Sequence, residues 1–376
     1  MKYLVLAVNR VNYWHVLMVQ IFTIFLLYFF LPGRVPVTLT AFQPDSINSV
    51  CMALNMFNAS DAKIAEALLN IEKHFYNVDF DLACSPEITP PYRVRLLLPF
   101  LMGLASLIGP WWTLFIPSVL IYLAIGFLTW NLVKQIPNPN WKVKGLALLP
   151  FLSPHIGWFL ANIMTEGPVI LACLGILSLL YSSRKTSKVL LIFGVLLLAV
   201  LCLLSKQSWP IVMIFLAISF QRIYPEVKMV ITYFLGLIIS ISVSELIKAL
   251  ARHIYGSDFG KWSDTAIFLD PENALVGVVK GLSHDFLHLF EFADFFGLVG
   301  ISVAVAVTFT RHINVHFRTL LLVCFGWGCA TVGSVYLADG SFGQNWRFFV
   351  FANFLAIPIA IIQNRSFSAN VVARHK

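Results

Sequence analysis

The chain has 376 residues, of which 59% are apolar and only 12% are charged. With a mean hydropathy of +0.82, too little polar surface is available for a water-soluble globule, so soluble enzymes and soluble binding modules are excluded. The net charge of +8 does not indicate a nucleic-acid partner, because membrane proteins concentrate Lys and Arg on the cytoplasmic side of their spans. The composition predicts an all-α polytopic membrane protein.

The first apolar run covers residues 14–31, long enough to cross a bilayer as a helix that rises about 1.5 Å per residue. Lys2 and Arg10 precede it, which predicts a cytoplasmic amino end. The run ends at Pro32-Gly33-Arg34, without the small residues that a signal peptidase requires. We therefore expect an uncleaved first span.

A long polar stretch, 32–111, follows and is expected to form a large extracytoplasmic loop. Residues 46–57 and 60–76 have the spacing of two amphipathic helices on the membrane surface, the second capped by Ser60. The short apolar run 96–108 is expected to be a re-entrant or interfacial helix. Cys51 and Cys84 share this loop and can pair as a disulfide. Its carboxylates, which mark a chemical face, include Asp45, Asp61, Glu66, Glu72, Asp79, Asp81 and Glu87.

Nine further apolar runs follow, which with the first predict about ten transmembrane helices in a single integral-membrane domain, 1–376. A second extracytoplasmic loop is expected at 251–294. The runs lie at 112–133, 145–161, 168–181, 189–204, 209–220, 229–250, 295–310, 319–337 and 348–362.

Charge tests this topology. When the spans alternate from a cytoplasmic start, 15 of the 26 Lys and Arg residues lie inside, and Glu226 is the only one of 18 carboxylates there. Both termini are then cytoplasmic. The outer face holds the remaining carboxylates, which indicates that the chemistry takes place on that side.

Several familiar sites are excluded. The sequence has no Walker lysine loop, no Gly-x-Ser-x-Gly elbow and no Gly-x-Gly-x-x-Gly after a strand, so no ATP or dinucleotide cofactor is expected. His284, His288 and Glu291 have the spacing of metal ligands, so a divalent metal site is possible here. The alternative is an interfacial helix whose His side chains lie at the membrane–water boundary. Asp79 and Asp81 resemble the Asp-x-Asp of nucleotide-sugar transferases, with a solvated turn as the alternative.

Ionisable residues recur at the outer ends of the predicted spans. Such groups are costly at membrane depth and are usually functional or paired. Cations there suit an anionic lipid headgroup such as a phosphate, with Arg giving bidentate bonds, whereas the alternative is ordinary snorkelling. The residues are Glu166, Lys206, Arg347 and the pair Arg93 and Arg95.

The order of these motifs resembles the GT-C superfamily of integral-membrane glycosyltransferases, which use sugars linked to polyprenyl phosphate. Residues 92–99, Tyr-Arg-Val-Arg-Leu-Leu-Leu-Pro, are similar to the Tyr-Arg-x-Arg-x-Leu-x-Pro stretch of bacterial members. Thr165-Glu166, Leu204-Ser205-Lys206, and Arg347 with Pro358 are similar to their later motifs. Members of the superfamily usually carry an Asp with a second acidic residue or a Tyr after the first span, and this chain has only Asp45 there. The resemblance covers most of the chain.

This resemblance implies an inverting transfer of a sugar from a polyprenyl-phosphate donor to a hydroxyl of a glycan, lipid or protein acceptor on the outer or lumenal face. It implies Asp45 and Glu166 as catalytic candidates, and donor-phosphate contacts from Arg93, Arg95, Lys206 and Arg347. No metal-ligand residues are assigned, and a divalent metal stays possible. Asp45 is the preferred general base because it lies fourteen residues after residue 31, near the membrane surface. Its alternative role is the N-cap of the first surface helix.

Two other functions stay open. Ten spans with Pro and Gly inside helices also suit a transporter or a flippase for lipid-linked saccharides. Such a protein needs polar groups at mid-membrane, and the candidates are few: His155, Asn353 and the serines of 229–250. An enzyme like O-antigen polymerase or ligase shares the lipid substrate.

Overall fold

In a computed structural model of the chain, all regular secondary structure of the described residues is helical. This confirms the predicted helical class. The described residues are 11–30, 44–75, 95–136, 139–153, 166–182, 187–206, 208–255, 271–287, 295–310, 313–339, 352, 354–360 and 362.

The helices follow the predicted apolar runs closely. Helix α2 continues as the π-helical turn η1, and the 3-10 turn η3 runs into α7. The bounds are α2 Tyr13–Phe25, η1 Leu26–Phe30, α3 Pro44–Met56, α4 Asp61–Phe75, α6 Leu97–Ile108, η3 Trp111–Phe115, α7 Ile116–Lys134, α8 Trp141–Leu152, α10 Glu166–Ser182, α11 Lys188–Ser205, α12 Trp209–Ile223, α13 Met229–Tyr255, α15 Pro271–Leu287, α17 Phe295–Phe309 and α18 Val315–Asp339.

Four helical segments are long and apolar enough to cross a membrane: Tyr13–Phe30, Trp111–Lys134, Lys188–Ser205 and Met229–His253. Shorter apolar helices accompany them, and the predicted count of ten spans stays a prediction. Large apolar side chains on α2, α11 and α13 are exposed, which fits a surface covered by lipid rather than water. They include Trp14, Phe22, Phe193, Val230 and Phe234. The chain is accordingly a multi-pass membrane protein.

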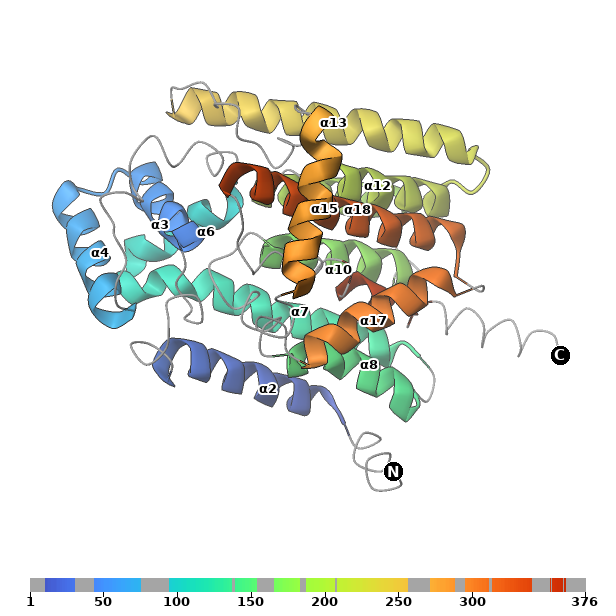
Figure 1. Cartoon of the computed structure of the whole chain (residues 1–376), viewed down its shortest axis with the longest axis horizontal. Helices are drawn as coiled ribbons and strands as arrows, with labels where there is room; N and C mark the ends of the chain where they lie inside the picture. The colour runs from blue at the N-terminus through green and yellow to red at the C-terminus, as the bar shows by residue number, and fades with distance from the viewer. Residues whose placement is uncertain are drawn as a thin grey trace.

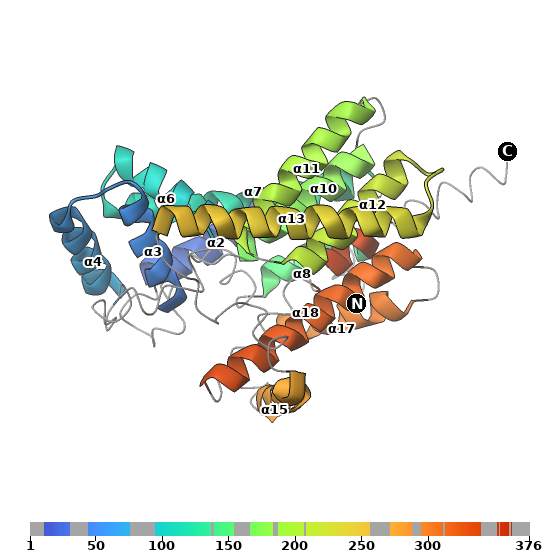
Figure 2. The same cartoon turned by 90° about the horizontal axis from the view of Figure 1, so that it is seen from above.

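The axes of α2, α7 and α13 are roughly aligned, with α7 running opposite to the other two, and α3, α4 and α6 gather at one end of the molecule (Figure 1). We call this the surface-helix end. Helix α13 packs along α12, and α10 packs against both α7 and α11. Helix α15 lies across α18 and perpendicular to α13 in both views (Figures 1 and 2).

The surface helices are joined by specific contacts. The rings of Phe57 and Phe100 lie 5.7 Å apart between the end of α3 and α6. Ser60 accepts a hydrogen bond from the backbone N–H of Lys63, which confirms the predicted cap of α4. The Lys63 ammonium then donates to the carbonyl of Ser106 near the end of α6, at 2.9 Å. The predicted helices at 46–57, 60–76 and 96–108 are thus confirmed as helices that pack on one another.

The predicted N-cap role of Asp45 is wrong. Helix α3 already includes Pro44, so Asp45 lies inside its first turn. Proline lacks an N–H and has a helix-compatible φ, which favours it at the first helical position and lets the helix start one residue earlier than expected. The side chain of Asp45 lies outside the described part of the structure.

Gly103 sets the approach of α3 to α6. A Cβ at this position would overlap the ring of Phe57 and lie 2.8 Å from the backbone oxygen of Ala53. We predict that Gly103→Ala lowers the free energy of unfolding by about 1–3 kcal/mol through overpacking, measured by thermal or denaturant unfolding in detergent.

Gly326 provides the matched control, because a Cβ added there meets nothing within 4 Å. Gly326→Ala should be neutral or stabilise by about 0.5–1 kcal/mol, the usual gain from Gly to Ala within a helix. Equal effects of the two substitutions would contradict the close packing of α3 on α6.

Candidate functional site

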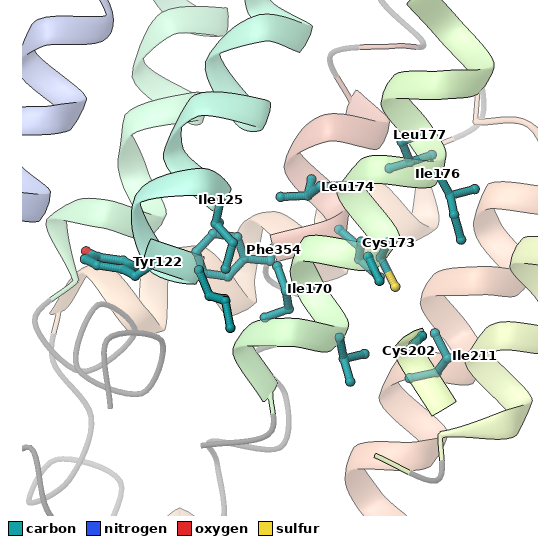
Figure 3. Close-up of a cluster of buried hydrophobic side chains, with 14 of the residues drawn as sticks. Tyr122, Ile125, Ile170, Cys173, Leu174, Ile176, Leu177, Cys202, Ile211 and Phe354 are labelled. Atoms are coloured by element: carbon teal, nitrogen blue, oxygen red, sulfur yellow. The ribbon is translucent and has the colours of Figure 1, made fainter. Parts of the chain in front are cut away.

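Helices α10 and α11 form an antiparallel hairpin whose open end carries the candidate site. Its interior is apolar: Ile170, Cys173 and Leu174 of α10 are buried in one cluster with Cys202 and Ile211 (Figure 3). Cys173 and Cys202 contact each other across the hairpin. Since α10 begins at Glu166 and α11 ends at Ser205, the chain brings Glu166 and Lys206 to the same end.

Glu166 and Lys206 form an ion pair there. The Lys206 ammonium donates to Oε1 of Glu166 at 2.8 Å, and the two side chains are only 5% and 2% exposed. The backbone around the pair is also held in place, because the N–H of Lys206 donates to the carbonyl of Cys202 at 3.0 Å. The N–H of Ser208 donates to the carbonyl of Lys206. Both charges are therefore fixed in an environment that excludes water.

The helices favour each charge where it lies. Glu166 is in the first turn of α10, where the N-terminal end of the helix dipole favours an anion. Lys206 is the C-cap residue of α11, where the dipole favours a cation. Each charge is thus compensated twice, by its partner and by the end of its own helix, which offsets part of the cost of removing it from water.

The ion pair lies toward the surface-helix end. Helix α12 starts just after Lys206 and leads through a short turn into α13, which runs back along it. The far end of α13 points to the same end of the molecule as α3 and α6 in both views (Figures 1 and 2). The start of α12, and with it Lys206, therefore faces the same side as the surface helices.

Basic residues gather at the opposite end of the hairpin. Nε of Arg222 donates to the carbonyl of Leu180 at 2.8 Å, and its guanidinium lies 4.1 Å from the ring centre of Tyr181. The Lys188 ammonium lies 5.0 Å from the ring centre of Tyr224. Lys188 and Arg222 are among the residues predicted to be cytoplasmic, and we call this the basic end. The basic residues predicted to be cytoplasmic and the Glu166–Lys206 pair thus lie at opposite ends of the α10–α11 hairpin.

The other predicted site residues are placed less completely. Arg95 is half-buried immediately before α6, and Asp45 is defined only by its place in α3. Arg93 and Arg347 lie outside the described residues, as do His155, Asp79, Asp81, His288 and Glu291. Within the described ranges, no group of three His, Cys, Asp or Glu side chains is arranged to hold a metal ion.

Cys51 of α3 is disulfide-bonded, which confirms its part in the predicted pairing, while Cys84 lies outside the described residues. The cysteines of the apolar helices, Cys173, Cys202 and Cys324, are free and buried. Buried free cysteines of this kind behave as small apolar side chains.

A buried polar contact in the middle of the membrane helices was missed by sequence reasoning. The side-chain amide of Gln20 donates to the backbone carbonyl of Tyr122 at 2.5 Å, joining α2 to α7. The signal in the sequence is a single Gln near the centre of an otherwise apolar span. Periodicity finds such a residue but does not show which helix it meets.

No protein-family model, curated protein or solved structure matches the chain. The resemblance to the GT-C superfamily therefore rests on the sequence motifs alone. The placement of the charged residues, above all Glu166 and Lys206, is the structural feature that bears most on function.

We predict strong coupling between Glu166 and Lys206. Glu166→Gln or Lys206→Met alone should lower the free energy of unfolding by about 3–5 kcal/mol, because each leaves a buried charge without its partner. The double variant should lose much less than the sum of the two, as measured by a double-mutant cycle on denaturant unfolding.

The exposed pair Glu245 and Lys248 on α13 is the control. Its atoms are 2.6 Å apart, but the Lys and Glu side chains are 34% and 60% exposed. Lys248→Met should cost less than about 1 kcal/mol. Additive effects at Glu166 and Lys206, or losses as small as this control, would show that the pair is not buried as described.

Proposed function

We propose that the chain is an integral-membrane glycosyltransferase that moves a sugar from a polyprenyl-phosphate donor to a hydroxyl of a glycan, lipid or protein acceptor. The transfer inverts the anomeric carbon and takes place on the extracytoplasmic or lumenal face. The proposal includes about ten spans with both termini cytoplasmic, the shorter apolar helices serving as further spans.

The observation that carries the proposal is the buried Glu166–Lys206 pair on the side of the surface helices. Charges removed from water at the end of a membrane helix are costly and are typically retained for function. Their two motifs are among those in which the sequence resembles the GT-C superfamily. The structure brings these motifs together across the α10–α11 hairpin, although they are 40 residues apart in the chain.

The residue types suit the chemistry. A carboxylate beside the acceptor removes the proton of its hydroxyl, and cations near the departing phosphate stabilise the charge that grows in the transition state. Because the negative charge of Glu166 is engaged by Lys206, we prefer Asp45 as the general base. The charge of Lys206 is balanced by Glu166 in the same way, so Lys206 is proposed to position this end of the hairpin beside the donor. Arg93, Arg95 and Arg347 are the proposed source of the positive potential at the donor phosphate.

Two observations support an extracytoplasmic position for the surface-helix end. Disulfides persist in oxidising compartments, and Cys51 of α3 is disulfide-bonded. Lys188, Arg222 and Lys228 are exposed at the basic end, as expected for the cytoplasmic side. The disulfide of Cys51 and the distribution of basic residues thus independently favour an extracytoplasmic surface-helix end and a cytoplasmic basic end.

This orientation predicts which engineered thiols a membrane-impermeant probe can reach. A cysteine replacing the exposed Glu66 on α4 should react in intact cells, and one replacing the exposed Lys228 only after permeabilisation. Cys173, Cys202 and Cys324 are buried and give a low background, and the half-buried free Cys329 is replaced by Ser beforehand. The reverse labelling pattern would overturn the orientation and, with it, the proposed active face.

Asp45 is the most specific test of the proposed reaction. Asp45→Asn keeps the size of the side chain but cannot accept a proton, so turnover should fall about 100-fold to 10,000-fold with stability unchanged. The measurement is transfer of labelled sugar from a panel of polyprenyl-phosphate sugars by purified protein.

The control is Glu66→Gln, which neutralises another carboxylate of the same loop on the exposed face of α4. It should retain the turnover of the parent protein. Near-parental turnover of Asp45→Asn would move the general base to another carboxylate, whereas a parent protein inactive with every donor of the panel would reject the transferase itself.

A further inference from the structure

The basic end of the molecule carries more positive charge than its own carboxylates can balance. Lys188 opens α11, Arg222 lies in the last turn of α12, and Lys228 immediately precedes α13. All three side chains are exposed, and the turn from α12 into α13 lies at the right-hand end in both views (Figures 1 and 2). Among the described residues of this end, Glu226 is the only carboxylate, and it forms no ion pair with the three cations.

The three cations belong to helices that pack on one another. Helix α12 contacts both α11 and α13, and α11 also contacts α13. The Lys188 ammonium lies 5.0 Å from the ring centre of Tyr224, the C-cap residue of α12. The N–H of Val227 donates to the carbonyl of Tyr224 at 3.1 Å, so a tight turn keeps Lys228 close to the end of α12. The fold therefore gathers these charges on one surface.

Arg222 is held in a fixed orientation on this surface. Its Nε donates to the carbonyl of Leu180 at 2.8 Å, and its Cζ lies 4.1 Å from the ring centre of Tyr181. The ring of Tyr181 is supported in turn by that of Phe317, with ring centres 6.2 Å apart. Stacking engages the face of a guanidinium, whereas its N–H donors lie in the plane. The two terminal nitrogens of Arg222 have no partner among the described residues and remain available to a ligand.

The ligand that fits this surface is both anionic and apolar. Two parallel N–H donors of a guanidinium match the oxygens of a phosphate or carboxylate. Large apolar side chains are exposed on the same helices, beginning directly beside the cations, and a water-soluble anion would leave them uncovered. An anionic phospholipid has a phosphate at the boundary and acyl chains alongside the helices. The exposed apolar residues are Val189, Leu190 and Phe193 on α11, and Val230 and Phe234 on α13.

We propose that the basic end binds an anionic phospholipid of the membrane leaflet on that side. Arg222 donates two hydrogen bonds to the lipid phosphate, while Lys188 and Lys228 add attraction from either side. The acyl chains lie against the exposed apolar faces of α11 and α13. This site is at the opposite end of the hairpin from the Glu166–Lys206 pair, so it does not depend on the proposed transferase activity.

Native mass spectrometry of the purified full-length protein in detergent tests the site. The probes are phosphatidylglycerol and phosphatidylcholine with identical acyl chains, which share the phosphate but differ in net charge. Phosphatidylglycerol should bind at least about tenfold more tightly. Lys188→Gln and Lys228→Gln, both exposed and harmless to the fold, should each weaken it about fivefold, and Arg222→Gln should remove most of the preference. Equal binding of the two lipids by the parent protein would overturn the proposal.

Two further variants separate a built site from a generally positive surface. Arg222→Lys keeps the charge but loses the planar pair of donors, so it should still weaken phosphatidylglycerol binding about fivefold. The matched control is Arg252→Gln, which removes the same charge from an exposed residue in the last turn of the 27-residue α13, at its other end. Its effect should stay below about twofold, because the length of α13 exceeds the Debye length several times. Parental binding by Arg222→Lys, or an equal loss in Arg252→Gln, would contradict the site.

Inorganic phosphate distinguishes a lipid from a free anion as the occupant. Phosphate lacks acyl chains, so at a concentration matched to the lipid it should leave phosphatidylglycerol bound. Displacement of the lipid by phosphate at that concentration would show a site for a soluble anion and would overturn the assignment to a phospholipid.

Discussion

The structure depends most on the compensation of two charges in an apolar environment. Glu166 and Lys206 are buried at the open end of the α10–α11 hairpin, and neither is tolerable there without the other. The pair joins the start of α10 to the end of α11, and α12 begins at Trp209, shortly after Lys206. Because α12 then directs α13 back toward the surface helices, one ion pair helps to define the end of the molecule where the chemistry is proposed.

Much of the fold could be predicted from the sequence, since long apolar runs have few alternatives to a helix in lipid. The predicted run 189–204 became α11, Lys188–Ser205, almost without change. Glu166 and Lys206 were identified as candidates because they are ionisable residues at the outer ends of predicted spans. Their pairing was not predicted, because a single sequence does not show which distant residues are in contact. Asp45 was misplaced as an N-cap because Pro44 starts the helix earlier.

The rival function, a transporter or flippase, gains one observation from the structure. The neutral contact between Gln20 and Tyr122 places polar groups at mid-membrane, where a translocation path would need them. The close packing of Gln20 against Gly126 argues against a path for a saccharide between α2 and α7. The buried charges, Glu166 and Lys206, lie instead toward one face of the membrane. A lipid-linked donor that reacts at the membrane surface accounts for that asymmetry better than a substrate that crosses the bilayer.

The most direct measurement follows a doubly labelled donor in proteoliposomes, with separate labels on the sugar and on the polyprenyl phosphate. We expect the sugar to move to an acceptor with inverted configuration, while an equal amount of free polyprenyl phosphate is released on the side of the surface helices. Protein-dependent passage of the intact donor across the bilayer, with both labels still joined and no transfer, would contradict it.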